Sequence, residues 1–318
     1  MSDQDHDDTV APARREFLEC MAWAGAGALW LMKGGVANAI TLPAGAKGGA
    51  AEAKDATFSF VQISDSHIGF HKAPNPDPVA SLRETIAHIN AQRQRPDFIV
   101  HTGDLTHLSR PEQFDTVAEL LKEAKTGQVF FIPGEHDVIG DNGKAFFARF
   151  GGGVSGGGWH SFDHHGVHFV ALINVLNLQA GGLGFLGSEQ LAWLRQDLAG
   201  LSASTPIVVF AHMPMWSLYP AWGWGTQDSA QALTLLRRFG SVTVLNGHIH
   251  QIQRKVEGQV TFYTARSTAY PQPAPGVGPA PGPLQSVPPG QLHRYLGSRD
   301  VRHVRGGEAI AVTDVALG

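Results

Sequence analysis

Short apolar runs alternate along the chain with longer segments in which apolar residues recur every three or four positions. The short runs favour buried β-strands, and the longer segments favour amphipathic helices. Such alternation is typical of a parallel or mixed sheet whose faces are covered by helices. The expected strands are 58–63, 97–100, 129–132, 207–210, 242–245 and one near 309–312, the expected helices are 78–93, 111–125, 188–198 and 229–239, and hairpins are expected at 159–173 and 256–264.

The strands of the alternating part end in carboxylate and imidazole side chains. Ligands of such sheets bind at the carboxyl ends of the strands, so we expect these loops to converge at one edge. The residues concerned are Asp65, His67, Asp104, Glu135, His136, Asp137, His212, His248 and His250.

Seven of these side chains form a donor set suited to metal ions. Oxygen and nitrogen donors without thiolate suit Mn, Fe, Co, Ni or Zn, and the chain has 16 histidines against one cysteine. Seven donors exceed the four of a tetrahedral zinc site. They suit two ions roughly 3.5–4 Å apart that share one carboxylate. The seven are Asp65, His67, Asp104, Glu135, His212, His248 and His250.

In order and spacing, the motifs that carry these residues resemble the five blocks of the calcineurin-like metallophosphoesterases. The resemblance spans about residues 58–265 and implies a four-layer α/β/β/α sandwich of two mixed sheets flanked by helices. It also implies hydrolysis of phosphate esters by a metal-bound hydroxide at a dinuclear centre. The blocks are Asp65-Ser66-His67, Gly103-Asp104, Gly134-Glu135-His136-Asp137, Ala211-His212 and Gly247-His248-Ile249-His250.

The resemblance also implies a role for each residue. The first metal would be held by Asp65, His67 and His250. The second would be held by Glu135, His212 and His248, with Asp104 bridging the two. The catalytic candidates are His136, as general acid or phosphate contact, and Asp137, as the group that orients it. Small residues at Gly103, Gly134 and Gly247 are expected to let the backbone approach closely.

Glu135 departs from the family pattern, which has Asn at this position. With two divalent ions and three carboxylates, the formal charge of the site is +1 instead of +2, which weakens the attraction for phosphate. One hypothesis is a mixed-valence pair that contains trivalent iron. The alternative is that Glu135 binds the second metal with modest retuning. We therefore expect two divalent or trivalent ions of Fe, Mn or Zn.

The sequence leaves the substrate open within one chemical class. We expect a small phosphorylated substrate and a phosphomonoesterase activity, with cyclic nucleotides or other phosphodiesters as the alternative. The rival from another class is a metal-containing binding protein that has lost turnover through Glu135. A formal net charge of −4 argues against nucleic acid as partner.

The N-terminal segment reads as a targeting signal. Paired arginines at Arg14-Arg15 precede a weakly apolar stretch and the small-residue site Ala37-Asn38-Ala39. This order is typical of a twin-arginine export signal, so we expect a signal peptide at 1–39, a linker at 40–55 and the metallophosphoesterase domain at 56–318. The expected partner is the twin-arginine machinery, and the expected location is periplasmic or secreted. The apolar stretch is too short for a stable membrane anchor.

Several segments near the motifs have open roles. The aromatic segment 213–224 would either bind an organic leaving group or close the core, and the Pro-rich loop 270–290 is expected to wrap near the site. Arg266 is a weak candidate for a phosphate contact, and His107 would support the site, contact the substrate or stabilise the fold. The glycine-rich loop 151–158 favours a permissive turn. Ordinary packed or surface roles are expected for His160, His164, His165 and His168.

Overall fold

The computed structural model of the protein describes residues 23–25, 28–33, 36–41, 56–151, 157–304 and 310–318. The chain divides into two units, Met1–Lys54 and Asp55–Gly318. The described part of the first unit is an antiparallel sheet in the order β1-β2-β3. The predicted signal peptide and linker lie largely outside the described residues, and export stays a prediction. The strands are β1 (Trp23–Gly25), β2 (Ala28–Lys33) and β3 (Val36–Thr41).

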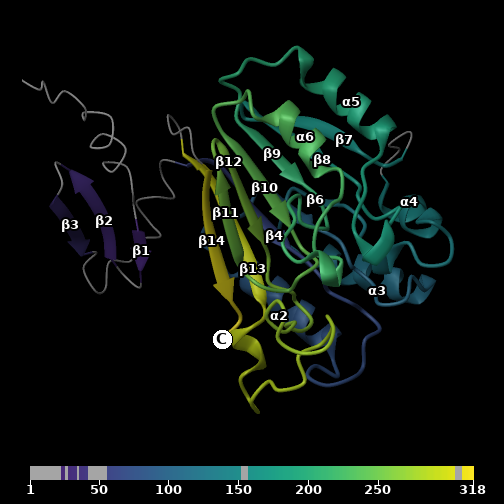
Figure 1. The fold of residues 1–318 in the computed structure, drawn as a ribbon. Helices are drawn as coiled ribbons and strands as arrows, with labels where there is room; N and C mark the ends of the chain where they lie inside the picture. Colours follow the sequence, from purple (N-terminus) through teal and green to yellow (C-terminus); the bar gives the residue numbers. More distant parts are fainter. Residues whose placement is uncertain (1–22, 26–27, 34–35, 42–55, 152–156, 305–309) are drawn as a thin grey trace, which may run out of the picture. The chain divides into compact units, whose positions relative to one another are not determined.

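The second unit contains two mixed sheets (Figure 1). The larger has the order β11-β12-β10-β9-β8-β7, in which the four inner strands are mutually parallel and the two edge strands are antiparallel to their neighbours. Its strands are β7 (His160–His164), β8 (Val167–Ala171), β9 (Ile207–Phe210), β10 (Val242–Asn246), β11 (Gln253–Glu257) and β12 (Val260–Thr264).

The smaller sheet has the order β14-β13-β4-β5-β6. Its strands β4, β5 and β6 are parallel, and β13 runs antiparallel to both β4 and β14. The strands are β4 (Ala56–Ile63), β5 (Phe98–His101), β6 (Gln128–Phe131), β13 (Gly297–Val304) and β14 (Ile310–Ala316).

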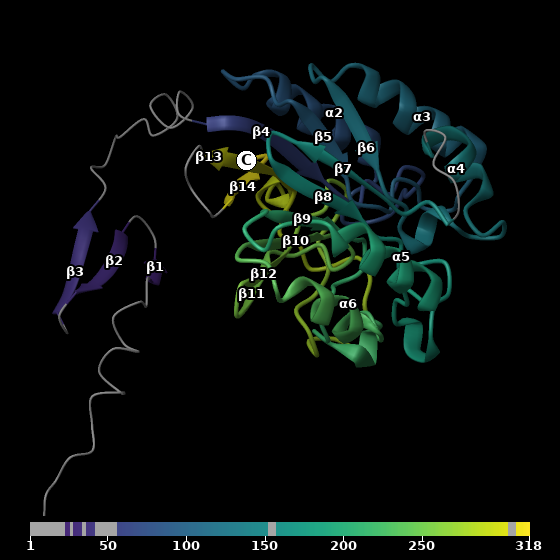
Figure 2. The ribbon, with the colours of Figure 1, turned by 90° about the horizontal axis from the view of Figure 1, so that it is seen from above.

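The two sheets lie face to face between two layers of helices, as Figure 2 shows from above. The expected four-layer α/β/β/α sandwich is therefore confirmed. The helices over the smaller sheet are α2 (Pro78–Asn90), α3 (Pro111–Lys122) and α4 (Lys144–Phe150), and those over the larger are α5 (Ser188–Ala199) and α6 (Ser229–Leu236).

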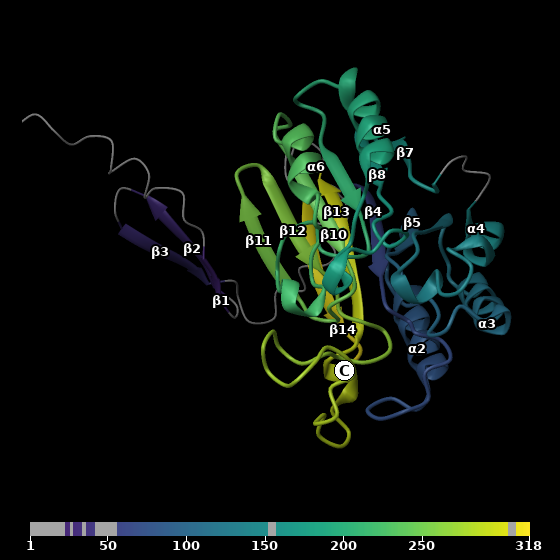
Figure 3. The same ribbon diagram turned by 45° about the vertical axis from the view of Figure 1, so that its right-hand side comes forward.

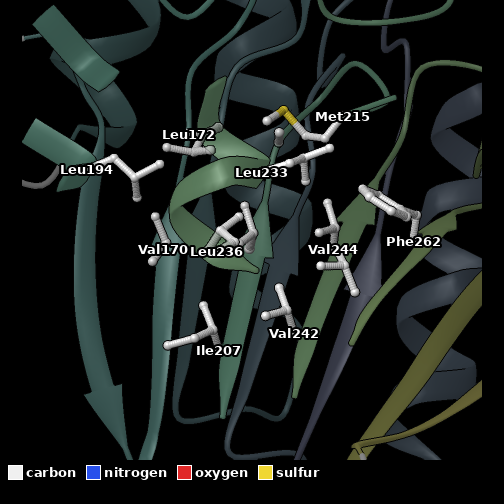
Figure 4. Close-up of a cluster of buried hydrophobic side chains, with 14 of the residues drawn as sticks. Val170, Leu172, Leu194, Ile207, Met215, Leu233, Leu236, Val242, Val244 and Phe262 are labelled. Carbon is white, nitrogen blue, oxygen red and sulfur yellow. The ribbon is translucent and has the colours of Figure 1, made fainter. Parts of the chain in front are cut away.

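Three apolar cores hold the layers together. Phe60, Phe98, Phe169 and Phe210 pack between the two sheets, with ring centroids 4.6–5.9 Å apart. A second core joins the larger sheet to α5 and α6 (Figure 4), and a third joins the smaller sheet to α2, α3 and α4. The side chains on one face of each sheet pack against the other sheet, and those on the opposite face pack against helices. Burial of this apolar surface holds the two sheets together without any contribution from the polar loops.

Most predicted elements are found within a few residues of their expected ends. The sequence did not indicate β13 or α4, and the first strand of the last hairpin, β11, begins at Gln253 instead of Val256. Residues 152–156 of the glycine-rich loop are outside the described residues, so its role stays a prediction. In the described part of the chain, no helix combines the length and the apolar character needed to cross a membrane.

Candidate metal centre

The carboxyl ends of five parallel strands, drawn from both sheets, carry the predicted ligands. In Figure 3 the coils that follow these strands gather at the lower end of the sheets, next to the yellow-green Pro-rich segment. The smaller sheet contributes its ligands after β4, β5 and β6, and the larger contributes its ligands after β9 and β10. All seven residues come together there: Asp65, His67, Asp104, Glu135, His212, His248 and His250.

The first predicted metal site is a compact triad. Donor atoms of Asp65, His67 and His250 all lie within 4.8 Å of one another, and all three side chains are buried. His67 Nε2 lies 3.2 Å from His250 Nε2, which in turn lies 3.3 Å from Asp65 Oδ1. This spacing brings two imidazole nitrogens and one carboxylate oxygen around a single point.

The second predicted site is a matching triad. Glu135, His212 and His248 also place donor atoms within 4.8 Å of one another. Glu135 Oε2 lies 2.8 Å from His212 Nε2, and Glu135 Oε1 lies 2.9 Å from His248 Nδ1. The carboxylate of Glu135 therefore lies at the second triad, as the sequence predicts. The side chain is longer than the Asn that the resemblance leads one to expect there, but it still places both oxygens beside the histidines.

Asp104 lies between the two triads. Its Oδ2 is 3.5 Å from His67 Nε2 of the first triad and 3.4 Å from His212 Nε2 of the second. Its Oδ1 accepts a hydrogen bond of 2.9 Å from the backbone N–H of His136, which fixes the direction of the carboxylate. This is the geometry that a bridging ligand requires.

The donor set fits two metal cations. Among the described residues, Glu135 Oε2, His212 Nε2 and both ring nitrogens of His248 are buried without a hydrogen-bond partner, a costly state for polar atoms. Burial alone would raise the pKa of Glu135, but the nearby His248 and His212 hold it well below its ordinary value. Bound cations would satisfy the buried donors and balance the three carboxylates.

Backbone carbonyls orient two of the ligand histidines. His212 Nδ1 donates to the carbonyl of Thr102 at 2.7 Å, and His250 Nδ1 donates to the carbonyl of Tyr270 at 2.6 Å. Each bond fixes the proton on Nδ1 and leaves the lone pair of Nε2 directed at the centre. Such partners set both the tautomer and the ring orientation of a metal-binding histidine.

The backbone of the ligand loops is strained. Five of the seven ligands have positive φ, a region that non-glycine residues seldom occupy. Strain of this kind persists only where surrounding contacts enforce it, and it clusters at functional sites. The residues are Asp65 (φ 55°), His67 (39°), Asp104 (53°), His248 (71°) and His250 (52°).

The glycines of the blocks leave room for the ligands, as expected. A Cβ added at Gly134 would lie 2.1 Å from Asp104 Oδ1, and one at Gly103 would lie 2.4 Å from His212 Nδ1. Gly103 also has a φ of +100°, which disfavours any side chain. At Gly247 an added Cβ would lie 2.1 Å from Ser64 Oγ.

His136 lies at the edge of the centre. Its Nδ1 donates to the carbonyl of His107 at 2.8 Å, and its ring centroid lies 4.8 Å from that of His67. Burial alone would lower the pKa of His136, but the carboxylates of Asp104 and Glu135 outweigh burial and raise it. With Nδ1 engaged, Nε2 is the ring atom left to exchange a proton with a ligand.

Asp137 does not orient His136, so this part of the prediction is wrong. Its carboxylate accepts hydrogen bonds from the backbone N–H groups of Gly134, Leu105 and Thr106 and from the hydroxyl of Thr106. Asp137 thus ties the loop after β5 to the loop after β6, the two loops that carry Asp104 and Glu135. The carbonyl of His107 takes the orienting role instead.

His107 contacts both the candidate ligand His67 and the proton-donor candidate His136. Its Nδ1 lies 3.4 Å from His67 Nδ1, and its ring stacks on that of His136 with centroids 5.0 Å apart. Burial lowers the pKa of His107 to about 4, so the ring is neutral near pH 7. Of the roles left open, these contacts favour support of the site.

Tyr270 and Gln272 belong to the site and were missed in the sequence. The ring of Tyr270 stacks on His67 with centroids 4.8 Å apart, and its carbonyl holds His250. Gln272 Nε2 donates to the carbonyl of His248 at 2.8 Å. These roles depend largely on backbone carbonyls, which have no signature in residue type.

A cavity of about 270 Å³ opens onto the centre. Trp222 and Trp224 of the aromatic segment line it, whereas Trp216 is buried in the core as one of the two expectations had it. Contact of the segment with an organic leaving group stays a prediction. Pro281 and Gly282 also line the cavity, and the Pro-rich loop therefore does reach the site. Arg266 lines a neighbouring cavity of about 440 Å³ instead.

The fold and the donor set define a hydrolase of phosphate esters with a dinuclear metal centre. The model of the calcineurin-like phosphoesterase family matches residues 58–252, and the chain belongs to this family. The expected class of enzyme, a metallophosphoesterase, is confirmed. Enzymes of this family use dinuclear metal centres.

Curated relatives agree with this assignment, and a solved structure shares the fold. The chain is 26% identical over 254 residues to the glycerophosphodiester phosphodiesterase GpdQ of Enterobacter lignolyticus, covering 76% of this chain and 88% of that protein. It is 26% identical to a 3',5'-cyclic-nucleotide phosphodiesterase of a Nostoc strain, covering 67% and 79%. The fold matches a dimetal phosphatase from Danio rerio with a TM-score of 0.64 and 15% identity, covering 83% and 98%.

Proposed function

We propose that the two triads and Asp104 hold two transition-metal ions, drawn from iron, manganese and zinc, at which the protein hydrolyses phosphate esters. The observation that carries the proposal is the position of Asp104 Oδ2, 3.5 Å and 3.4 Å from one histidine of each triad. A pair of bound cations supplies Lewis acidity toward the phosphoryl oxygens and a nucleophile at neutral pH.

The chain's own residues supply the proton for the leaving group. His136 is held through Nδ1 by a carbonyl, and the carboxylates of Asp104 and Glu135 raise its pKa against the opposing effect of burial. Nε2 can then donate a proton to the departing alkoxide, a step worth roughly 10²–10⁴-fold in rate. A binding protein without turnover has no need of such a group.

Both monoester and diester hydrolysis remain candidates, and one observation favours the diester. The described residues that line the cavity include no lysine or arginine, and Glu135 adds a third carboxylate to the centre. A phosphomonoester carries up to two negative charges, whereas a diester carries one and suits a formal site charge of +1. The curated relatives described above are named as phosphodiesterases, which supports the same preference.

The test compares substrates of different charge on the metal-loaded enzyme. We expect Glu135→Asn to raise the kcat/KM for an aryl phosphomonoester relative to an aryl diester by at least about tenfold, since the removed charge repels the dianion more strongly. The matched control is Glu123→Asn on the exposed end of α3, which should leave the ratio unchanged.

Other outcomes have clear meanings. An unchanged ratio in Glu135→Asn would contradict the charge argument and leave the phosphomonoesterase as the preferred candidate. A parent enzyme inactive toward both esters and a cyclic nucleotide, with activity appearing only in Glu135→Asn, would favour the binding protein instead.

A further inference from the structure

A second cluster of metal-binding side chains lies at the opposite end of β5 from Asp104. Asp97 precedes this strand, His164 is the last residue of β7, and His165 begins the turn between β7 and β8. Donor atoms of these three residues lie within 4.8 Å of one another. The cluster shares no residue with the centre described above.

Asp97 is held so that one carboxylate oxygen remains available. Its Oδ2 accepts a hydrogen bond of 3.0 Å from the backbone N–H of Ser59, which anchors the side chain to β4. Its Oδ1 lies 3.5 Å from His164 Nε2. The side chains of Asp97 and His164 are 32% and 29% exposed, so the cluster lies at the surface of the domain although His164 Nε2 itself is buried.

The two histidines are held in position by the fold. The ring of Phe58 meets His164 edge-on with centroids 5.0 Å apart and stacks on His165 at 5.8 Å. His165 has a φ of +49°, a conformation that its turn with Gly166 imposes. Both imidazoles therefore pack against the ring of Phe58, and the ring of His165 is otherwise exposed.

His164 Nε2 has an unmet bonding capacity. The atom is buried and has no hydrogen-bond partner among the described residues. His168 on the same hairpin differs, because carboxylate oxygens of Asp163 and Asp197 lie within 2.9 Å of its two ring nitrogens. His168 is a packed histidine, as expected, whereas His164 and His165 are arranged like ligands.

We propose that Asp97, His164 and His165 form a third metal site, which binds a zinc-like divalent cation. Two nitrogen donors and one carboxylate suit Zn²⁺, Co²⁺ or Ni²⁺. Two donors bound to one zinc ion at roughly 2.0–2.1 Å lie about 3.3–3.4 Å apart, close to the separation of Asp97 Oδ1 and His164 Nε2. Three protein ligands leave the remaining position for water.

The ion would join the two sheets of the sandwich. Its histidines belong to the larger sheet, and Asp97 belongs to the loop that enters the smaller one. Binding that requires both sheets in place stabilises the folded state and leaves the reaction at the far end of β5 unchanged. The site is thus structural and separate from catalysis.

The test measures Zn²⁺ content in full-length protein whose two-metal centre is already loaded. In equilibrium dialysis, the parent should bind one equivalent of Zn²⁺ more than the double variant His164→Gln/His165→Gln, or bind it at least about tenfold more tightly. Zn²⁺ should raise the Tm of the parent alone, while kcat/KM stays equal in the two proteins. His293→Gln is the matched control, since His293 pairs with Glu84 at 3.4 Å, and it should behave as the parent.

Equal Zn²⁺ content in the parent and the double variant across the titration would overturn the proposal. If the double variant does not fold, Asp97→Asn decides, because the amide oxygen can still accept from Ser59 while the charge is lost. Retention of the extra Zn²⁺ by Asp97→Asn would likewise overturn it. The catalytic proposal does not depend on this result, since hydrolysis is measured separately.

Discussion

At the scale of single residues, the centre depends on small side chains next to large ones. Gly134 has a φ of −97°, which any residue can adopt, so its requirement is purely one of space. The space is taken by Asp104, whose backbone N and Oδ1 would lie 2.4 Å and 2.1 Å from an added Cβ. A backbone atom cannot rotate away, so a methyl group must displace the loop that carries Asp104.

Gly134→Ala should therefore lower both metal content and turnover. We expect kcat/KM to fall by about 10²-fold, as follows from a displacement near 1 Å in a reactive site, together with a lower metal-to-protein ratio. Elemental analysis and phosphate ester assays check this. Gly200→Ala is the matched control, because Gly200 has a φ of −87° and open space around its Cβ position. Parent-like activity in Gly134→Ala would contradict the steric argument.

At the scale of elements, polar contacts fix helices to sheets. His168 on β8 lies 2.9 Å from Asp197 on α5 through Nε2. Burial alone would lower the pKa of His168, but hydrogen bonds to Asp197 and Asp163 outweigh it and raise the pKa above 6.5. Burial would raise the pKa of Asp197, but hydrogen bonds from His168 and Ser161 bring it below 3.8.

The stability that this pair contributes should depend on pH in a definite direction. The contribution of His168 is complete below pH 6.5 and is lost as the pH rises through its raised pKa. The contribution of Asp197 is complete above pH 3.8 and is lost as the pH falls through its lowered pKa. The difference in free energy of unfolding between the parent and His168→Gln should thus be largest between about pH 4 and 6.5 and should shrink by about pH 9.

Denaturant titrations at several pH values measure this difference. The control is His293→Gln, in which an exposed histidine–carboxylate pair is removed, and it should change stability by less than about 1 kcal/mol at each pH. A difference for His168→Gln that grows from pH 6 to pH 9 would have the wrong sign.

Element prediction failed where charged residues are buried. The segment of β13 contains Arg299, Asp300 and Arg302, which read as a polar loop. Arg299 is nevertheless fully buried, because Asp314, Gln62 and the carbonyl of Thr264 accept its hydrogen bonds. The pattern of apolar and polar residues along this segment could not show these partners, since they belong to three other strands. The helix α4 has seven residues, too few for a periodic pattern to stand out.

The convergence of the candidate ligands, in contrast, could be predicted because metal chemistry restricts residue type. Carboxylates and imidazoles at strand ends are visible in the sequence, and the topology brings them to one edge. The orientation of His136 and His250 could not be predicted, since it comes from the carbonyls of His107 and Tyr270. Asp137 was misassigned for the same reason: its partners are mostly backbone N–H groups.

At the scale of the whole molecule, the centre belongs to both sheets. Four of the seven ligands follow strands of the smaller sheet, and three follow strands of the larger. Aromatic packing such as that of Phe60 on Phe210 joins the sheets in the interior, and the donor set joins them at the edge. Ions bound there require both sheets to be docked.

Removal of the metals should therefore lower the stability of the entire domain. Free metal at about a thousandfold above Kd contributes about 4 kcal/mol, which corresponds to a fall in Tm on the order of 10 °C after chelation. Calorimetry with and without chelator measures this, and added metal should restore the original Tm. Gly134→Ala should respond much less. An unchanged Tm in the parent after verified metal loss would contradict the idea that the bound metals join the two sheets.

The positive φ of five ligands limits how this centre can be redesigned. Aspartate, asparagine and histidine tolerate that conformation better than other non-glycine residues. The backbone conformation and the need for a metal-binding side chain therefore restrict these five positions to the same few residue types. Among the described residues, Glu135 and His212 are the two ligands outside the positive-φ set. Backbone conformation therefore restricts the choice of residue less at Glu135 and His212 than at the other five, so engineering of metal preference or substrate charge can begin there.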